Sequence, residues 1–116
     1  SSNNKQEKEK LYAIQKANEF AIEIPLEVIS HCLRIIELSE ELIDNGNPNL
    51  VSDAGVSAEV SLAGVRGAAM NVLINLIGID DDSYCNKKRE LVNKFINDAE
   101  KNWKIVFDKT MKKIIL

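Results

Sequence analysis

Two asparagines, Asn71 and Asn75, are the side chains whose type and spacing point most directly to chemistry. They stand four residues apart, so on a helix they lie about 40° apart and face the same way. Each amide offers hydrogen-bond donors and an acceptor together, and two of them in an apolar helix suit a flat heterocycle with mixed edges. Hydrogen bonding between helices in a core would use the same pair, and the residue pattern alone leaves both interpretations open.

A second polar cluster, NPNLVSD, lies at the start of the same helix and contains Asn47, Asn49, Ser52 and Asp53. These residue types are typical of turns and caps: Ser52 is the expected N-cap, and the Asp53 carboxylate suits the positive end of the helix dipole. Asp53 precedes Asn71 by about 27 Å along a straight helix, so the two clusters cannot line one small pocket in a single chain. An antiparallel two-fold pairing of this helix would bring the start of one copy near the end of the other.

The element that positions both clusters is a predicted central helix from Asp53 to Ile77. Its small residues recur at four-residue spacing, in the pairs Ala54 and Ala58, Ser57 and Ser61, Gly64 and Ala68, and Ala63 and Gly67. Each glycine inside a helix costs about 1 kcal/mol relative to alanine, so Gly55, Gly64 and Gly67 together cost roughly 3 kcal/mol. We therefore expect a close approach at these glycines, by neighbouring helix backbones or by a flat ligand.

The preceding segment, from about Glu7 to Asn45, has apolar residues at three- and four-residue spacing and predicts helix. Pro25 interrupts this pattern, because a proline inside a helix removes one hydrogen bond and clashes with the preceding turn. We expect either one kinked helix or two helices that meet near Ile24. The dipeptide Asn45-Gly46 predicts a left-handed cap at the C-terminal end of the segment.

The final segment predicts one long amphipathic helix from about Ser83 to Lys113, after the central helix has ended at Gly78. Its start is acidic, and Asp82 or Ser83 is the expected N-cap. Three or four long helices with short connections, and no strand pattern, predict an all-α bundle of long helices. Residues 1–116 are expected to be part of one such helical domain.

Composition argues against several classes of function. The formal net charge of −3 gives no electrostatic reason to expect a nucleic-acid partner. The most apolar stretch, about 54 to 79, is interrupted by charged and amide side chains, so no membrane span is expected. The two cysteines, Cys32 and Cys85, match no metal-binding spacing and are expected to be buried or half-exposed thiols. We expect a cytoplasmic protein without a metal or a cofactor.

Residues 46–76 read GNPNLVSDAGVSAEVSLAGVRGAAMNVLINL. Together with the preceding IEIPLEVISHCLRIIELSEELIDNG, this run resembles the cyclodeaminase domain of formiminotransferase-cyclodeaminase and its stand-alone relatives, the methenyltetrahydrofolate cyclohydrolases. The resemblance covers about Lys10 to Phe107, and it is specific, because GN-x-N-x-x-SD-x-x-V followed by NVLIN is not a general helix pattern. It implies an all-helical domain whose working form is a dimer.

The resemblance implies one of two related reactions on a tetrahydrofolate derivative, which is a substrate and not a cofactor. A cyclohydrolase opens 5,10-methenyltetrahydrofolate with water to 10-formyltetrahydrofolate, and a cyclodeaminase closes formiminotetrahydrofolate and expels ammonia. A carboxylate that stabilises the cationic folate and moves a proton suits both reactions, and by resemblance this candidate catalytic residue is Asp53. The candidate folate-binding residues, the last of them for the anionic tail, are Asn49, Ser52, Asn71, Asn75 and Arg66.

The Gly-rich loop and the aspartate-bearing helix with which the family domain begins are absent from residues 1–116. The chain therefore resembles the C-terminal part of the domain, and the expected partners are folate, a second copy and the missing N-terminal half. Alone, the chain is expected to be inactive, and to be poorly stable or to self-associate through the face that the missing helices cover. The alternative is a non-catalytic helical dimerisation or interaction module on the same scaffold.

Overall fold

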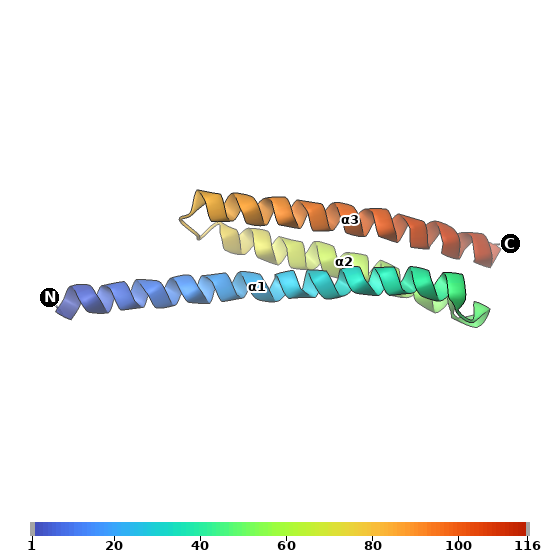
Figure 1. Cartoon of the computed structure of the whole chain (residues 1–116), viewed down its shortest axis with the longest axis horizontal. Helices are drawn as coiled ribbons and strands as arrows, with labels where there is room; N and C mark the ends of the chain where they lie inside the picture. Colours follow the sequence, from blue (N-terminus) through green and yellow to red (C-terminus); the bar gives the residue numbers. More distant parts are fainter. Residues whose placement is uncertain (1, 116) are drawn as a thin grey trace.

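Three long helices make up most of the computed structural model, which describes residues 2–115 of the chain (Figure 1). They are α1 (Ser2–Asn45), α2 (Val51–Leu76) and α3 (Asp82–Ile115), with a short 3₁₀-helix, η1 (Pro48–Leu50), between the first two. The elongated bundle measures 75 × 21 × 17 Å. The prediction of an all-α bundle of long helices is confirmed; of the expected range 1–116, the two terminal residues lie outside the described part.

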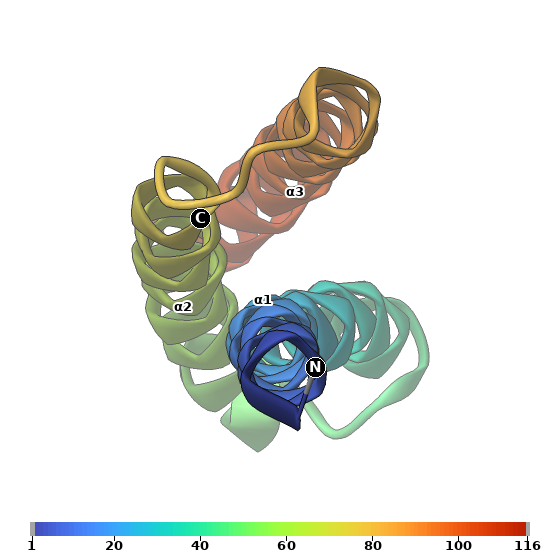
Figure 2. The same cartoon turned by 90° about the vertical axis from the view of Figure 1, so that its left-hand side faces the viewer.

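Every helix contributes to the core through apolar residues that recur seven positions apart. The buried set comprises Ile22, Ile29, Ile36 and Ile43 of α1, Val51, Ala58, Val65 and Val72 of α2, and Cys85, Val92, Ala99 and Val106 of α3. Burying one large aliphatic side chain contributes about 1.5–3 kcal/mol. Because seven residues fall slightly short of two helical turns, this repeat favours helices that cross at a small angle and supercoil to the left. The end-on view in Figure 2 shows the three helices nearly along their axes, with α2 beside both α1 and α3.

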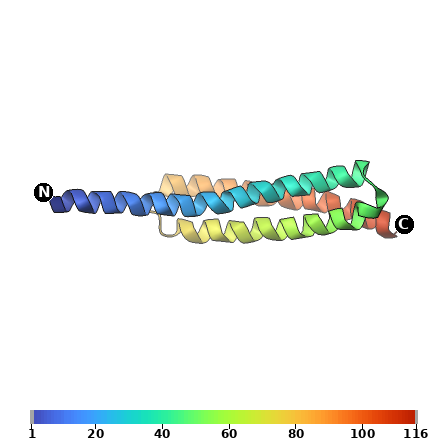
Figure 3. The same ribbon diagram turned by 90° about the horizontal axis from the view of Figure 1, so that it is seen from below.

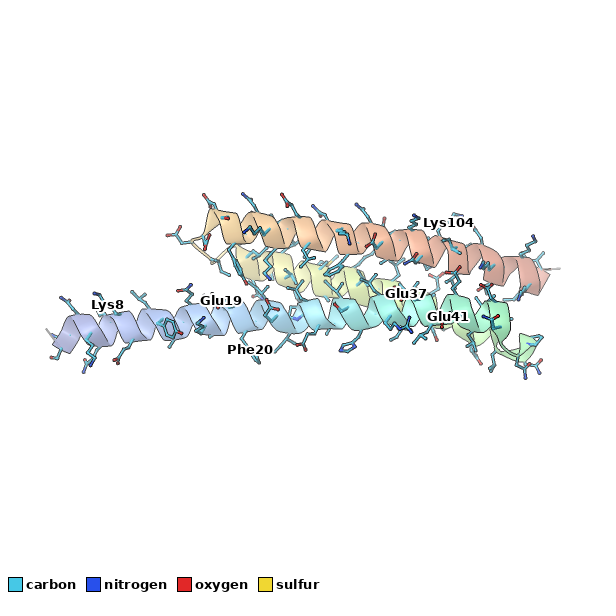
Figure 4. All side chains as sticks on the ribbon, in the orientation of Figure 1. Lys8, Glu19, Phe20, Glu37, Glu41 and Lys104 are labelled. Atoms are coloured by element: carbon cyan, nitrogen blue, oxygen red, sulfur yellow. The ribbon has the colours of Figure 1, made fainter. Side chains whose placement is uncertain are left out.

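α1 is a single helix of 44 residues that continues through Pro25. Two separate helices are therefore excluded and a single helix is confirmed, while the kink expected at Pro25 stays a prediction. The helix begins at Ser2, before the predicted start near Glu7, because Gln, Glu and Lys favour helix even where no apolar face marks it. Its first turns extend beyond α2 and α3 (Figure 3). The side chain of Phe20, which is 66% exposed, points away from the other two helices (Figure 4).

Two of the three glycines inside α2 lie against a neighbouring helix. A Cβ atom at Gly55 would lie 2.6 Å from Cγ2 of Thr110 in α3, and one at Gly64 would lie 2.7 Å from Sγ of Cys32 in α1. Close packing is confirmed at these two glycines, where a side chain of the next helix, not its backbone, fills the space. At Gly67 a Cβ atom would meet nothing within 4 Å, so residues 2–115 give no packing reason for this glycine.

The end of α1 differs from the prediction. No glycine in residues 2–115 has a positive φ, so the predicted left-handed cap at Gly46 is wrong. Instead, the Gly46 N–H donates to the carbonyl oxygen of Leu42 at 2.8 Å. A Cβ atom at Gly46 would collide with that same oxygen, so glycine is needed here for space and not for its access to the left-handed region.

The start of α2 also differs from the prediction. Ser52 is not the N-cap, because the chain is already helical in η1 and α2 follows it directly at Val51. The side-chain cap in this connection is Asn47, whose Oδ1 accepts a hydrogen bond from the backbone N–H of Asn49 at 2.9 Å. Asp53 does lie in the first turn of α2, as predicted.

The N-cap of α3 lies one position before the predicted candidates. Oδ1 of Asp81 accepts a hydrogen bond from the backbone N–H of Tyr84 at 3.0 Å, so the expectation of Asp82 or Ser83 is wrong. Three acidic residues in a row are equally good caps by type, and only the path of the short connection selects one of them.

Candidate functional site

A groove of about 360 Å³ lies between α1 and α2. Its lining residues are Ala21, Ile24, Pro25 and Val28 from α1 and Gly64, Ala68, Asn71 and Asn75 from α2. Gly64 and Ala68 keep the α2 side of the groove low because they carry little or no side chain. The volume is within the range of about 300–1,000 Å³ that is usual for small-molecule sites.

The structure brings Asn71 and Asn75 together, as their spacing predicts. Both amides are exposed and both line the groove. Asn75 Nδ2 also donates to the backbone carbonyl oxygen of Ala21 in α1, at 3.4 Å. Of the two uses that the sequence left open, a hydrogen bond between helices is observed for Asn75, and ligand binding by the two amides stays a prediction.

The polar cluster at the start of α2 lies at the other end of the helix. Ser52 lines a separate hollow of about 510 Å³, in which Lys113 of α3 also takes part. Asn49 and Asp53 are exposed beside it. Since Asp53 and Asn71 are about 27 Å apart along the helix, one chain does not unite the candidate carboxylate with the amides.

Arg66 points to the α3 side of α2 and is not among the residues that line the groove. Its Nη2 atom forms an ion pair with Oε1 of Glu100 at 3.0 Å, with both side chains about half exposed. Five residues separate Arg66 from Asn71, which turns the two side chains about 140° apart on a helix. The geometry therefore does not bring Arg66 to the amides, and its role stays a prediction.

Sequence reasoning missed the apolar wall that α1 gives to the groove. Ile24 and Val28 are 49% and 42% exposed, and Pro25, which is buried, lines the groove with them. The sequence marked Pro25 as a helix breaker only. Its place beside two aliphatic residues was the available signal for an apolar wall of the groove.

Both cysteines are free, Cys32 half-buried and Cys85 buried, as predicted. Burial raises the pKa of the Cys32 thiol, so the thiol and not the reactive thiolate is its form at neutral pH. In residues 2–115 no three His, Cys, Asp or Glu side chains are grouped to hold a metal ion. Across the same residues, no helix has an apolar run that would let it cross a membrane.

A line of apolar residues on the far side of α2 from the core is exposed, and we call it the outer stripe. It consists of Val56, Val60, Ala63, Gly67, Met70, Ile74 and Ile77, spaced alternately four and three residues apart. Its larger members are between 60% and 75% exposed. Soluble monomers rarely leave a contiguous apolar surface of this kind in contact with water, and such a surface usually marks a site of interaction.

The fold and the groove define an all-helical protein with a ligand-sized space between its first two helices. The sequence pattern of the formiminotransferase-cyclodeaminase family matches residues 1–94, so the chain belongs to this family. The resemblance seen in the residues is thereby confirmed.

Curated relatives carry two kinds of name. The chain is 35% identical over 86 residues to the methenyltetrahydrofolate cyclohydrolase of Methylorubrum extorquens, a match that covers 74% of this chain and 41% of the relative. It is 32% identical over 88 residues to the formimidoyltransferase-cyclodeaminase of Rattus norvegicus, covering 76% of this chain and 16% of the relative. The pig (Sus scrofa) protein of that name is 30% identical over 97 residues, with 84% and 18% covered. The chain thus spans less than half the length of these relatives.

Proposed function

We propose that the chain forms the C-terminal part of a tetrahydrofolate-processing domain. The complete domain hydrolyses 5,10-methenyltetrahydrofolate to 10-formyltetrahydrofolate, or closes formiminotetrahydrofolate with release of ammonia. Family membership and the names of the relatives support the substrate class. The observation that carries the proposal is the groove in which two amides and an apolar wall face one space.

The groove suits the pterin end of folate. A pterin is flat and presents donors and acceptors along one edge, which match amide groups that offer both. The aliphatic side chains of Ile24 and Val28 provide an apolar surface for the ring face. Asn71 and Asn75 fix the ring's orientation, and Arg66, already paired with Glu100, reaches the anionic tail only if that ion pair opens.

Asp53 is the proposed catalytic residue. Its carboxylate stabilises the cationic methenyl carbon and moves a proton at the tetrahedral intermediate next to the folate nitrogens. This role requires a second copy of the chain, because Asp53 lies about 27 Å from Asn71 within one copy. Asn49 and Ser52 lie beside Asp53 and join the substrate site by the same route.

The outer stripe supports an antiparallel two-fold pairing of α2 with its copy. Read in the opposite direction, its positions shift by at most one residue, so an antiparallel copy still places apolar residues opposite apolar residues, as a self-complementary interface requires. In the paired helices Val56 faces Ile77, Val60 faces Ile74 and Ala63 faces Met70, with Gly67 beside the axis. Gly67, which has no packing role in one chain, then lets the two backbones come close. In this pairing, Asp53 of one copy and Asn75 of the other are separated by about 8 Å measured along the helix axes.

The missing N-terminal half of the domain is the proposed cover for α1. Beyond the groove, this helix exposes apolar residues of its own, Ile35, Leu38 and Leu42. The curated cyclohydrolase is more than twice as long as the part that this chain matches, which leaves enough sequence for further helices.

The test uses the complete helical domain and follows the decay of methenyltetrahydrofolate absorbance. Replacing Asn71 and Asn75 by leucine removes two hydrogen bonds and is expected to slow the reaction about hundredfold. Asn93 and Asn97 are the matched control, because they are exposed on α3 with the same spacing. Their replacement by leucine is expected to leave the rate unchanged.

Two further outcomes decide between alternatives. Ammonia release from formiminotetrahydrofolate identifies the cyclodeaminase, and its absence beside rapid methenyltetrahydrofolate hydrolysis identifies the cyclohydrolase. A complete domain that accelerates neither reaction over buffer contradicts the proposal and favours a non-catalytic helical interaction module.

A further inference from the structure

Pro25 leaves one carbonyl group of α1 without its usual partner. Pro25 lies inside α1 and has no backbone N–H, so the carbonyl oxygen of Ala21, four residues earlier, lacks its donor within the helix. α2 supplies a donor in its place, because Asn75 Nδ2 lies 3.4 Å from that oxygen. The proline and the asparagine are thus complementary parts of one contact between two helices.

This contact decides how the Asn75 amide is turned. A carbonyl oxygen only accepts hydrogen bonds, so the amide nitrogen and not the amide oxygen must face Ala21. The amide oxygen Oδ1 accepts no hydrogen bond within residues 2–115 and remains available at the groove. An asparagine without this tie would present either end to a ligand, whereas here the choice is fixed.

We propose that Pro25 is a positioning residue of the groove, which acts through Ala21 to hold Asn75 with its amide oxygen available to the ligand. A ligand must then present an N–H donor at this point. The pterin edge, with its ring N–H and amino group, meets this requirement; that identification rests on the proposed function. Pro25 also takes part in the groove directly, since its ring lines it.

The first experiment observes Asn75 itself by nuclear magnetic resonance on the complete helical domain. One side-chain amide proton of Asn75 is expected to shift and to exchange with water more slowly than those of Asn93, an exposed asparagine of α3. Pro25→Ala restores an N–H to the Ala21 carbonyl, so both Asn75 protons should then resemble those of Asn93. Pro48→Ala changes the chain's other proline, which lies outside the groove, and should leave Asn75 unaffected.

The second experiment measures kinetics of the complete domain. Pro25→Ala is expected to raise the KM for the folate substrate about tenfold with little change in kcat, because it misplaces a group that holds substrate and does not react. Asn75→Asp keeps the side-chain shape but lacks the amide donor. It breaks the same contact from the α2 side, and so it serves as the test if Pro25→Ala fails to fold. The double variant should match Asn75→Asp alone, since both changes break one contact; effects that add would overturn the proposal.

The two experiments separate this inference from the proposed function. Asn75 protons that look like those of Asn93 in the unaltered chain, or that ignore Pro25→Ala, overturn the inference whatever the enzyme does. A complete domain without folate chemistry ends the proposed function, while the resonances still decide whether Pro25 positions Asn75.

Discussion

The two faces of α2 consist of similar residues in opposite surroundings. On the inner face, Val65 and Val72 are 0% exposed between α1 and α3, whereas on the outer stripe Val60 and Ile74 are 67% and 62% exposed. A helix that is apolar all round is normally buried all round. The difference teaches that, within residues 2–115, only one of the two apolar faces of α2 is packed, and the proposed pairing assigns the other face to a second copy.

The glycines of α2 also differ between the packed inner face and the exposed outer stripe. Gly55 and Gly64 face neighbouring helices, and a Cβ atom at either position would press against a side chain. Gly67 lies in the outer stripe, where a Cβ atom would meet nothing. The inner glycines are explained by contacts within residues 2–115, and the outer one has no such contact and is assigned to the proposed pairing of two copies.

The largest expected effect comes from placing an aspartate on the inner face of α2, compared with one on the outer stripe. Val65→Asp buries an unpaired carboxylate, which costs several kcal/mol and is comparable to the whole stability of a small domain, so the chain should unfold. Val60→Asp stays in water and should change the free energy of unfolding of the monomer by no more than about 0.5 kcal/mol. Urea unfolding followed by circular dichroism measures both, and equal losses would refute the distinction between the faces.

An intermediate effect compares two glycines. Gly55→Ala places a methyl group against buried Thr110 and should destabilise the chain by about 1–3 kcal/mol. Gly67→Ala, measured in the Val60→Asp background to remove pairing, should stabilise it by up to about 1 kcal/mol, because alanine favours helix. Urea midpoints provide the comparison, and a loss of stability at Gly67 would mean that something in the chain already occupies that space.

The smallest effect concerns two partly exposed ion pairs between α1 and α3, where Lys109 of α3 lies 2.9 Å from Asp44 and 3.0 Å from Glu40 of α1. Hydrogen bonds to Asp44, and then to Glu40, raise the pKa of Lys109. Its contribution to stability is therefore fully present below the unfolded-state pKa of about 10.4 and is lost as pH rises through the folded-state value. The difference between the unfolding midpoints of the unaltered chain and Lys109→Met should stay constant below about pH 10.4 and shrink above it; a difference that grows above that pH would contradict the assignment.

The sequence predicts the helices well because each has a long apolar repeat, and the core isoleucines of α1 follow directly from it. It predicts the caps poorly. The run NPNLVSD offers several good capping residues, and the one that is used, Asn47, depends on η1, which no periodicity reveals. The same limit explains the misplaced cap of α3, where Asp81 is chosen over its neighbours by the path of the connection.

The candidate site likewise has features that the sequence predicts and features that it does not. The pairing of Asn71 with Asn75 follows from four-residue spacing, which any helix preserves. The direction of Arg66 and the tie between Asn75 and Ala21 depend on where α3 and α1 pack, so spacing within α2 cannot supply them. The catalytic role of Asp53 and the folate contacts of Asn49 and Ser52 stay predictions, because they need a second copy of the chain.

The most direct test of this account is the mass of the chain in solution, measured by sedimentation equilibrium. If the outer stripe is built for a second copy, the 13.0 kDa chain should sediment as a species of twice that mass at sufficient concentration. Val60→Asp should sediment as the monomer, and Ile35→Asp, an exposed change on α1, should remain paired. An unaltered chain that stays folded and monomeric at every concentration would contradict the claim that the outer face of α2 is an interface between copies.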